Sequence, residues 1–149
     1  MHDPFDDPVL GRVIWNAERN CWVFDAGPVT GRPIPASYDP ADNHLPPSEQ
    51  GWDGVRTCVR WVRTNEPDAR EYMTRQLFER WMQDWYDEDV DDGMTPESFR
   101  EKLHLSGINF YEDQEARLIY DDGGLFGGHG FSLQVNAAGE FVAGPDMFG

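Results

Sequence analysis

Alternating apolar and polar positions in the last third of the chain predict a set of β-strands. Ala116, Leu118 and Tyr120 alternate with other residues, and the run from 131 to 135 repeats this pattern, as expected for strands that bury one face. Short connections between the runs favour antiparallel pairing. We therefore expect a meander with strands at residues 105–111, 115–121, 131–135 and 140–143, the first two joined by a turn at 112–114.

The N-terminal part of the chain also contains β-forming runs. Residues 13–15 and 22–24 flank a stretch of turn residues and predict a hairpin. The run 32–38 has a similar composition, but Pro33 and Pro35 lack a backbone N–H, so we expect an edge strand or an irregular segment there. The segments expected to be irregular are about 1–8 and 39–47.

Apolar residues recur at helical spacing in the middle of the chain and predict three helices. The first spans about 48–64. The second begins at Pro67, which suits a first helical turn, and ends near Tyr86 because the acids that follow oppose the helix dipole. The third starts at Thr95 and buries Phe99. The core ridge of the second helix is expected to contain Met73, Leu77, Trp81 and Trp85.

Together these elements predict the α+β class. We expect an antiparallel sheet, made of the N-terminal hairpin and the C-terminal meander, packed against two to three central helices. A length of 149 residues predicts a single domain over 1–149. An aromatic content of 13% supports an ordered core.

The charge of the chain restricts its partners. There are 28 acidic and 12 basic residues, a formal net charge of −16, which disfavours nucleic acid and anionic membranes and favours a basic protein. Arg56, Arg60 and Arg63 share a helix face, where ion pairs with the many acids are expected. Cys21 and Cys58 form no disulfide framework or zinc motif, and no run is long enough to span a bilayer. We therefore expect a cytoplasmic protein.

An acidic run follows the second predicted helix. Its members are Asp87, Glu88, Asp89, Asp91 and Asp92, which we call the acidic segment. The alternating acids resemble the start of a calcium loop, but Asp92 and Ser98 then occupy positions six and twelve, where glycine and glutamate belong, so no metal site is predicted. The remaining alternatives are a solvated loop and a contact surface for a basic partner.

A glycine-rich stretch lies between the two alternating runs. Its characteristic residues, which we call the bend, are Asp121, Asp122, Gly123, Leu125, Phe126, Gly128 and His129. Asp121, Asp122 and His129 would suit a metal-dependent or acid/base enzyme. The alternative, which we favour, is that the aspartates accept hydrogen bonds from backbone amides of the turn. The apolar pair Leu125 and Phe126 predicts a packed bend.

Four stretches resemble a known bacterial family. They are the Trp-rich acidic end of the second helix, Thr-Pro-Glu-Ser-Phe at 95–99, Ile-Asn-Phe-Tyr-Glu-Asp at 108–113 and Tyr-Asp-Asp-Gly-Gly-Leu-Phe-Gly-Gly-His at 120–129. From about residue 7 to residue 142 the chain resembles the bacterial domain of unknown function 2262 and its close relatives. The resemblance implies, by genomic association, that relatives include immunity proteins of polymorphic toxin systems, and it brings no catalytic residues or cofactor.

From these observations we expect a protein-binding domain. The favoured function is an immunity protein that binds a basic toxin through the acidic segment, by charge complementarity and without turnover. The alternative is an enzyme that uses the Asp121, Asp122 and His129 group. The sequence leaves the oligomeric state and the identity of the partner open.

Overall fold

The structure is a computed structural model that describes residues 2–40, 47–111 and 115–149. Within these residues eight strands and three helices form, and the helices lie between the fourth and fifth strands. The strands are β1 (Phe5–Asp7), β2 (Gly11–Asn16), β3 (Cys21–Asp25), β4 (Pro35–Asp39), β5 (His104–Tyr111), β6 (Ala116–Asp121), β7 (Gly130–Val135) and β8 (Phe141–Phe148). The helices are α1 (Glu49–Asp84), α2 (Glu88–Asp91) and α3 (Pro96–Lys102). The predicted α+β class is confirmed, and the predicted turn at 112–114 lies outside the described residues, as does most of 39–47.

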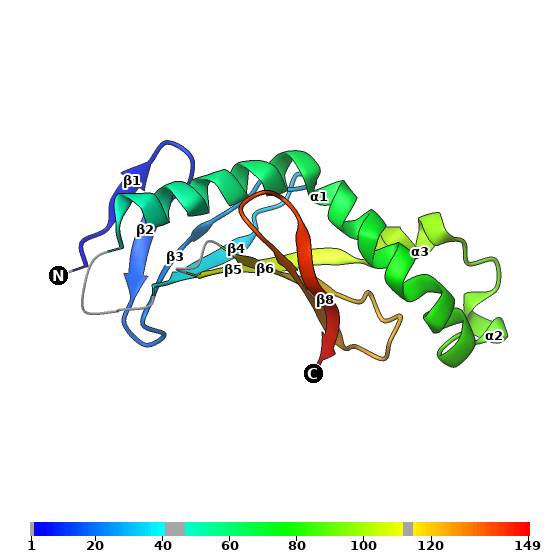
Figure 1. Ribbon diagram of the computed structural model, residues 1–149. Coiled ribbons are helices and arrows are strands. Elements are labelled where there is room, and N and C mark those ends of the chain that lie inside the picture. The colour runs from blue at the N-terminus through cyan, green and yellow to red at the C-terminus, as the bar shows by residue number, and fades with distance from the viewer. Residues whose placement is uncertain (1, 41–46, 112–114) are drawn as a thin grey trace.

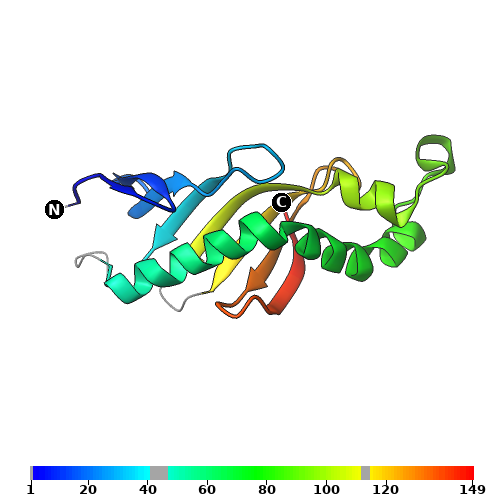
Figure 2. The ribbon, with the colours of Figure 1, turned by 90° about the horizontal axis from the view of Figure 1, so that it is seen from above.

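The strands form one sheet in chain order from β1 to β8. The predicted hairpin and meander are both present, and neighbouring strands are antiparallel except for β4 and β5, which are parallel. Parallel neighbours need a long crossover connection, and all three helices lie in it. Figures 1 and 2 show α1 running along one face of the sheet.

β4 corrects the prediction for the proline-containing run. It pairs with β3 on one side and β5 on the other, so it is a central strand and not an edge or irregular segment. Pro33 precedes the strand and Pro35 is its first residue, so neither proline interrupts the strand interior. Pairing with β5 depends on residues about seventy positions away, which local sequence patterns do not show.

β1 lies in the segment that was expected to be irregular. It pairs with β2, and Asp7 at its end is buried. The Asp7 carboxylate accepts hydrogen bonds from the amides of Val9 and Leu10 and forms an ion pair with Arg56 of α1 at 2.8 Å. Pairing with β2 and the contacts of the Asp7 side chain therefore both hold this short strand in place. Arg56 also contacts Glu49 and Asp53, as expected, whereas Arg60 and Arg63 form no ion pair within the described residues and Arg63 donates to the Ala26 carbonyl instead.

α1 is one helix where the sequence predicted two. Ser48 caps its N-terminus through the amide of Gly51, and Pro67 lies in its interior. Pro67 has no N–H to donate to the carbonyl four residues earlier, and Figure 1 shows that α1 bends in its middle. Buried residues on both sides of the proline, such as Val62 and Met73, belong to one core, so tertiary packing keeps the helix continuous.

The other two helices differ in how well the sequence predicts them. α3 begins as predicted, with Thr95 and Ser98 forming a reciprocal cap and Phe99 fully buried. α2 occupies part of the acidic segment, so that segment is a four-residue helix with capping residues instead of a loop. Both helices extend beyond the end of the sheet, next to the last turns of α1 (Figure 1).

The two faces of the sheet differ in what covers them. Ala116, Leu118 and Tyr120 of β6 are at most 1% exposed and belong to the core with buried residues of α1, which confirms the predicted alternation. No helix of the described residues covers the other face (Figure 1). We call it the open face. Residues paired in register across it are Val23, Ser37, Asn109, Arg117 and Gln134.

Candidate functional site

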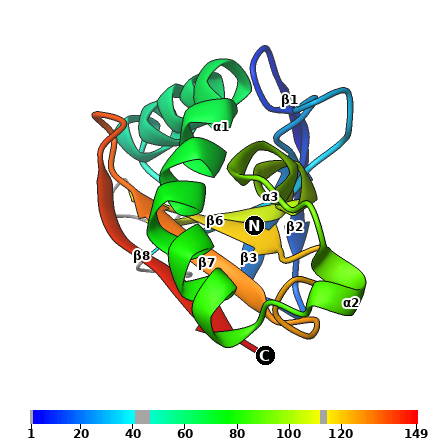
Figure 3. The ribbon, with the colours of Figure 1, turned by 90° about the vertical axis from the view of Figure 1, so that its right-hand side faces the viewer.

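The last turns of α1 bring the bend and the acidic segment together. Trp81 is 1% exposed, and its indole Nε1 donates a hydrogen bond to the Leu125 carbonyl at 2.8 Å. Trp85 is one turn further on, and its ring lies 5.5 Å from the ring of Phe126 and 6.2 Å from that of His129. Figure 3 shows the bend beside the end of α1 and close to α2. The two predicted sites therefore form one end of the molecule.

Hydrogen bonds to backbone amides hold the bend in shape. The buried Asp122 carboxylate accepts from Gly124 at 2.8 Å, from Phe126 at 2.8 Å and from Gly128 at 3.1 Å. Asp121 accepts from the amide of Gly123 at 2.8 Å. These are the turn contacts that we favoured from the sequence. Both oxygens of Asp122 accept hydrogen bonds, so this carboxylate stabilises the bend.

The apolar residues of the bend are packed, as predicted. Leu125 is 8% and Phe126 1% exposed. Gly123 has a positive φ, and its Cα lies against the Lys102 carbonyl so closely that a Cβ would collide with it. A glycine is therefore required where the bend meets the end of α3, and the bend is a rigid part of the fold.

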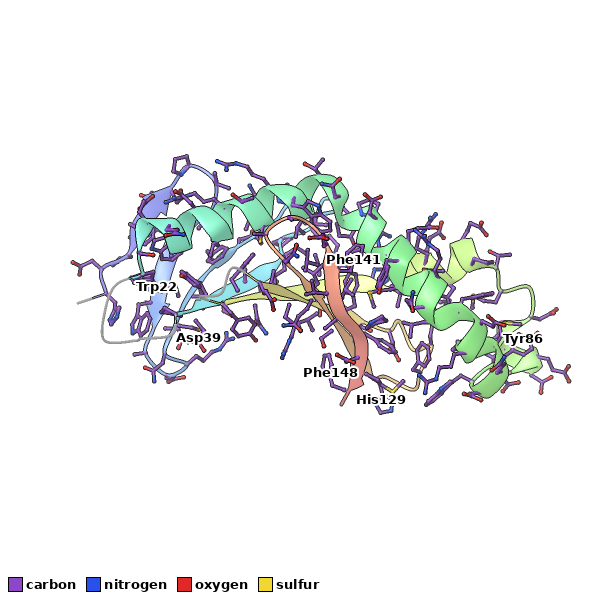
Figure 4. The ribbon with its side chains drawn as sticks, viewed as in Figure 1. Trp22, Asp39, Tyr86, His129, Phe141 and Phe148 are labelled. Atoms are coloured by element: carbon purple, nitrogen blue, oxygen red, sulfur yellow. The ribbon has the colours of Figure 1, made fainter. Side chains whose placement is uncertain are left out.

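His129 is at the corner where the bend meets the end of β8. A shallow hollow there is lined by Asp121, His129 and Phe148, and Figure 4 shows the last two side by side. The Phe148 ring lies over Gly130, where a side chain would collide with it. Among residues 2–40, 47–111 and 115–149, no group of three or more His, Cys, Asp and Glu side chains is placed to hold a metal ion. The structure thus places the three residues of the enzyme alternative close together without completing a metal site.

The acidic segment is exposed at the tip of the molecule. Asp87 caps α2 by accepting from the Asp89 amide at 2.9 Å, and Asp91 accepts from the Asp87 amide at 2.9 Å. Asp91 is half-buried, whereas Asp87, Glu88, Asp89 and Asp92 are exposed. In the described part of the chain, none of the five forms an ion pair.

Negative charge at this end opposes the stability of α1. Residues 84–97 contain seven acids and no basic residue, and the last turn of α1 has no basic residue to compensate its C-terminal dipole. Acids close to a helix C-terminus are unfavourable by roughly 0.3–1 kcal/mol each. The charges therefore do not serve this end of α1, although Asp87 caps α2 and Glu88 and Asp89 lie in the first turn of α2, where acids are favourable.

Large apolar side chains are exposed among these acids. Met82 is 39%, Trp85 41% and Val90 78% exposed. Trp81 and Trp85 were both predicted to lie in the core. The prediction is correct for Trp81 and wrong for Trp85. We call residues 82–92, together with His129, the acidic end. The exposure of Trp85 follows from its position as the C-cap, beyond the part of α1 that packs on the sheet. The sequence feature that could have indicated this exposure is the acidic segment, which begins two residues after Trp85.

The comparison with known families covers nearly all of the chain. The sequence profile of the family described as "Uncharacterized protein conserved in bacteria (DUF2262)" matches residues 7–144. The chain belongs to this family. The match includes α1, the acidic segment and the bend, so the acidic end lies within the DUF2262 region. No match to this DUF2262 chain was found among curated proteins or among solved structures.

A buried polar group in this DUF2262 chain connects the middle of α1 to the sheet. Glu66 is 1% exposed and accepts hydrogen bonds from the Tyr120 hydroxyl at 3.1 Å and from Arg70 at 3.0 Å. Burial, and then the nearby Glu66 carboxylate, raise the pKa of Tyr120 well above its usual value, so the phenol stays protonated. Both oxygens of the Glu66 carboxylate accept hydrogen bonds, and the bond from Tyr120 connects α1 to β6 next to Pro67.

None of the helices in the described part of this DUF2262 chain combines the length and apolar character needed to cross a membrane.

Proposed function

We propose that this chain is a cytosolic protein-binding domain that masks a basic surface of a partner protein, as an immunity protein masks its toxin. The observation that carries the proposal is the acidic end, where acids without ion pairs among the described residues surround the exposed Trp85 and Val90. The proposed action is steric occlusion, without chemical turnover.

The two kinds of side chain have different tasks in such an interface. A large aromatic anchor that becomes desolvated supplies most of the binding energy, and Trp85 has this character. The surrounding carboxylates attract a cationic partner from a distance and exclude acidic ones, which raises the association rate and the specificity. Trp85 is held against Phe126, so little conformational entropy is lost when it binds.

The immunity role starts from the resemblance seen in the sequence, which implies that relatives include immunity proteins of polymorphic toxin systems, whereas the matching family is itself described only as uncharacterised. A cytosolic location also suits a chain whose two cysteines, Cys21 and Cys58, are both buried. The acidic end gives this implied role a physical basis, because it offers a cationic toxin a complementary surface.

Co-expression with a toxin tests the proposal. The protein encoded directly upstream, or its C-terminal domain, is produced in a host whose growth it arrests, and the chain is co-expressed with it. We expect growth to be restored by the wild type and by a variant in which five distant exposed acids are neutralised. These control positions are Asp3, Glu18, Asp39, Asp68 and Asp146. Neutralising the five acids of the acidic segment should abolish the rescue.

Two results would contradict the proposal. One is full rescue by the variant whose acidic segment is neutralised, since that result removes the segment from the interface. The other is detoxification by the purified chain through consumption of a small molecule, with no complex between the two proteins. Size-exclusion chromatography of the mixed proteins separates these cases, because occlusion requires a stable complex.

A further inference from the structure

The open face contains a hollow that is separate from the acidic end. It has a volume of about 240 Å³ and lies over β3, β4 and β5, and its lining residues include Arg19, Ser37, Gly107 and Asn109. Pockets for drug-sized ligands usually measure roughly 300–1,000 Å³, so this one suits a smaller molecule. Its lining residues Ser37 and Asn109 belong to the open face, which no helix of the described residues covers.

Gly107 creates part of this space. Ile108 next to it is buried on the helix side, so Gly107 belongs to the open face, as does Asn109. A Cβ built on Gly107 would meet only the Pro35 carbonyl oxygen at 3.4 Å, an ordinary contact. The hollow therefore exists because this strand position has no side chain, although the backbone would accept one.

Asn109 and Arg19 offer hydrogen-bond donors at the hollow, beside the acceptor oxygen of the Pro35 carbonyl. The Ser37 hydroxyl donates a hydrogen bond to Asn109 Oδ1 at 2.9 Å. This bond occupies the hydroxyl proton of Ser37 and the side-chain oxygen of Asn109. The amide Nδ2 of Asn109 has no acceptor among the described residues, and two N–H groups are left for a ligand. Asn16 Oδ1 accepts from the Arg19 amide at 3.0 Å and fixes the turn that places Arg19 at the rim.

Arg19 is the charged residue that lines the hollow, and Arg117 pairs in register with Asn109 on the next strand. Neither Arg19 nor Arg117 forms an ion pair within the described residues, and Arg117 lies over the Tyr111 ring beside Asn109 in the strand register. Arg32, Arg60, Arg63 and Arg80 also form no ion pair within the described residues, so what distinguishes Arg19 is its place at the rim of the hollow that Asn109 lines.

We propose that this hollow binds a small molecule through a carboxylate group. The carboxylate oxygens accept from the Asn109 amide and from the Arg19 guanidinium, a charge-assisted arrangement that Arg forms in bidentate geometry. Ser37 keeps the Asn109 side chain in the required orientation by its hydrogen bond to Oδ1. The site is independent of the acidic end, which attracts cations at the other side of the molecule.

Titration of the intact chain with succinate tests this inference. ¹⁵N NMR follows the Asn109 side-chain amide and the Arg19 Nε, and sodium chloride at equal ionic strength serves as the reference for non-specific screening. We expect a saturable shift of both signals with succinate and none with sodium chloride. If the two salts move the signals equally, or if succinate, citrate and glutamate all leave them unmoved, the proposal is overturned.

Three variants locate the binding. Arg19→Gln removes the charge, and Gly107→Val fills the hollow with a side chain suited to a strand; each should weaken succinate binding at least about tenfold. Arg32→Gln, which removes the same charge from an exposed arginine outside the hollow, should bind as the wild type does. Equal affinities for Arg19→Gln and Arg32→Gln would contradict the site, and far-ultraviolet circular dichroism shows that the variants are folded.

Discussion

At the scale of single residues, neighbouring carboxylates in this protein have different roles. Asp122 is 1% exposed and accepts three backbone hydrogen bonds, whereas Asp121 is exposed and accepts one. Asp7 is 7% exposed and paired with Arg56, whereas Asp6 next to it is exposed. Burial, which alternates along a strand, separates structural acids from surface acids.

The two aspartates of the bend should differ in their effect on stability. Asp122→Ala leaves three amides without their acceptor and should lower the free energy of unfolding by about 3 kcal/mol. Asp121→Ala should lower it by less than about 1 kcal/mol. Urea unfolding measures both. Similar losses for the two variants would contradict the structural role assigned to Asp122.

The ion pair of Asp7 and Arg56 should make stability depend on pH. Burial alone raises the pKa of the Asp7 carboxyl, but the hydrogen bonds from Arg56, Leu10 and Val9 outweigh it and place this pKa below its usual value. A lowered folded-state pKa means that the stabilisation is complete above the unfolded pKa of about 4 and is lost as the pH falls through the folded value.

Asp7→Asn isolates this contribution. At pH 7 the variant should be less stable than the wild type by about 2 kcal/mol, the order of a hydrogen bond to a charged group. The difference should shrink as the pH is lowered from about 5 to about 2. Thermal unfolding across this range provides the measurement, and a constant difference would show that the carboxylate charge is not responsible.

At the scale of elements, Trp81 connects α1 to the bend. Trp81→Phe removes the hydrogen bond to the Leu125 carbonyl and leaves a small cavity, so stability should fall by about 2 kcal/mol. The amides of Phe126 and Gly128 should then exchange faster with solvent, because the bend opens more easily. Trp61→Phe is the matched control, since Trp61 packs on Phe141 of β8 instead. Unchanged exchange in the Trp81 variant would contradict this connection.

Local sequence patterns predict some elements well, but they fail for elements whose length or strand pairing depends on contacts between residues far apart in the sequence. The β2–β3 hairpin, the meander and α3 follow from alternation, turn residues and the cap at Thr95, all within a few residues. α1 passes Pro67 without ending because its buried residues on both sides share one core, and β4 is central because β5 pairs with it. These two outcomes depend on tertiary packing, which overrides local preference.

At the scale of the whole molecule, the acidic segment and the hollow of the open face lie on different elements. The acidic segment projects beyond the end of the sheet (Figure 1), whereas the hollow is lined by residues of β3, β4 and β5. The acidic segment and the bend were both predicted from sequence as separate candidates. Their meeting at Trp85 could not be predicted, because it requires α1 to pack on a connection about forty residues further along the chain.

The acidic segment should carry a small stability penalty. Neutralising Asp87, Glu88, Asp89, Asp91 and Asp92 as amides should leave the fold intact and raise the free energy of unfolding by about 0.5–1 kcal/mol at low ionic strength, because it removes repulsion near a helix C-terminus. Urea unfolding at low and high salt measures this. A clear loss of stability would show that the acids serve the fold, which would remove the reason to assign them to a partner.

The most direct measurement of the central claim is the dissociation constant of the complex with the partner toxin, followed between about 50 and 500 mM NaCl. If the acidic end binds a cationic surface, the affinity of the wild type falls steeply with salt and the variant with a neutral acidic segment binds weakly with a shallow slope. The variant with five distant acids neutralised should keep the steep slope. An affinity that changes neither with salt nor with neutralisation of the acidic segment would contradict the account.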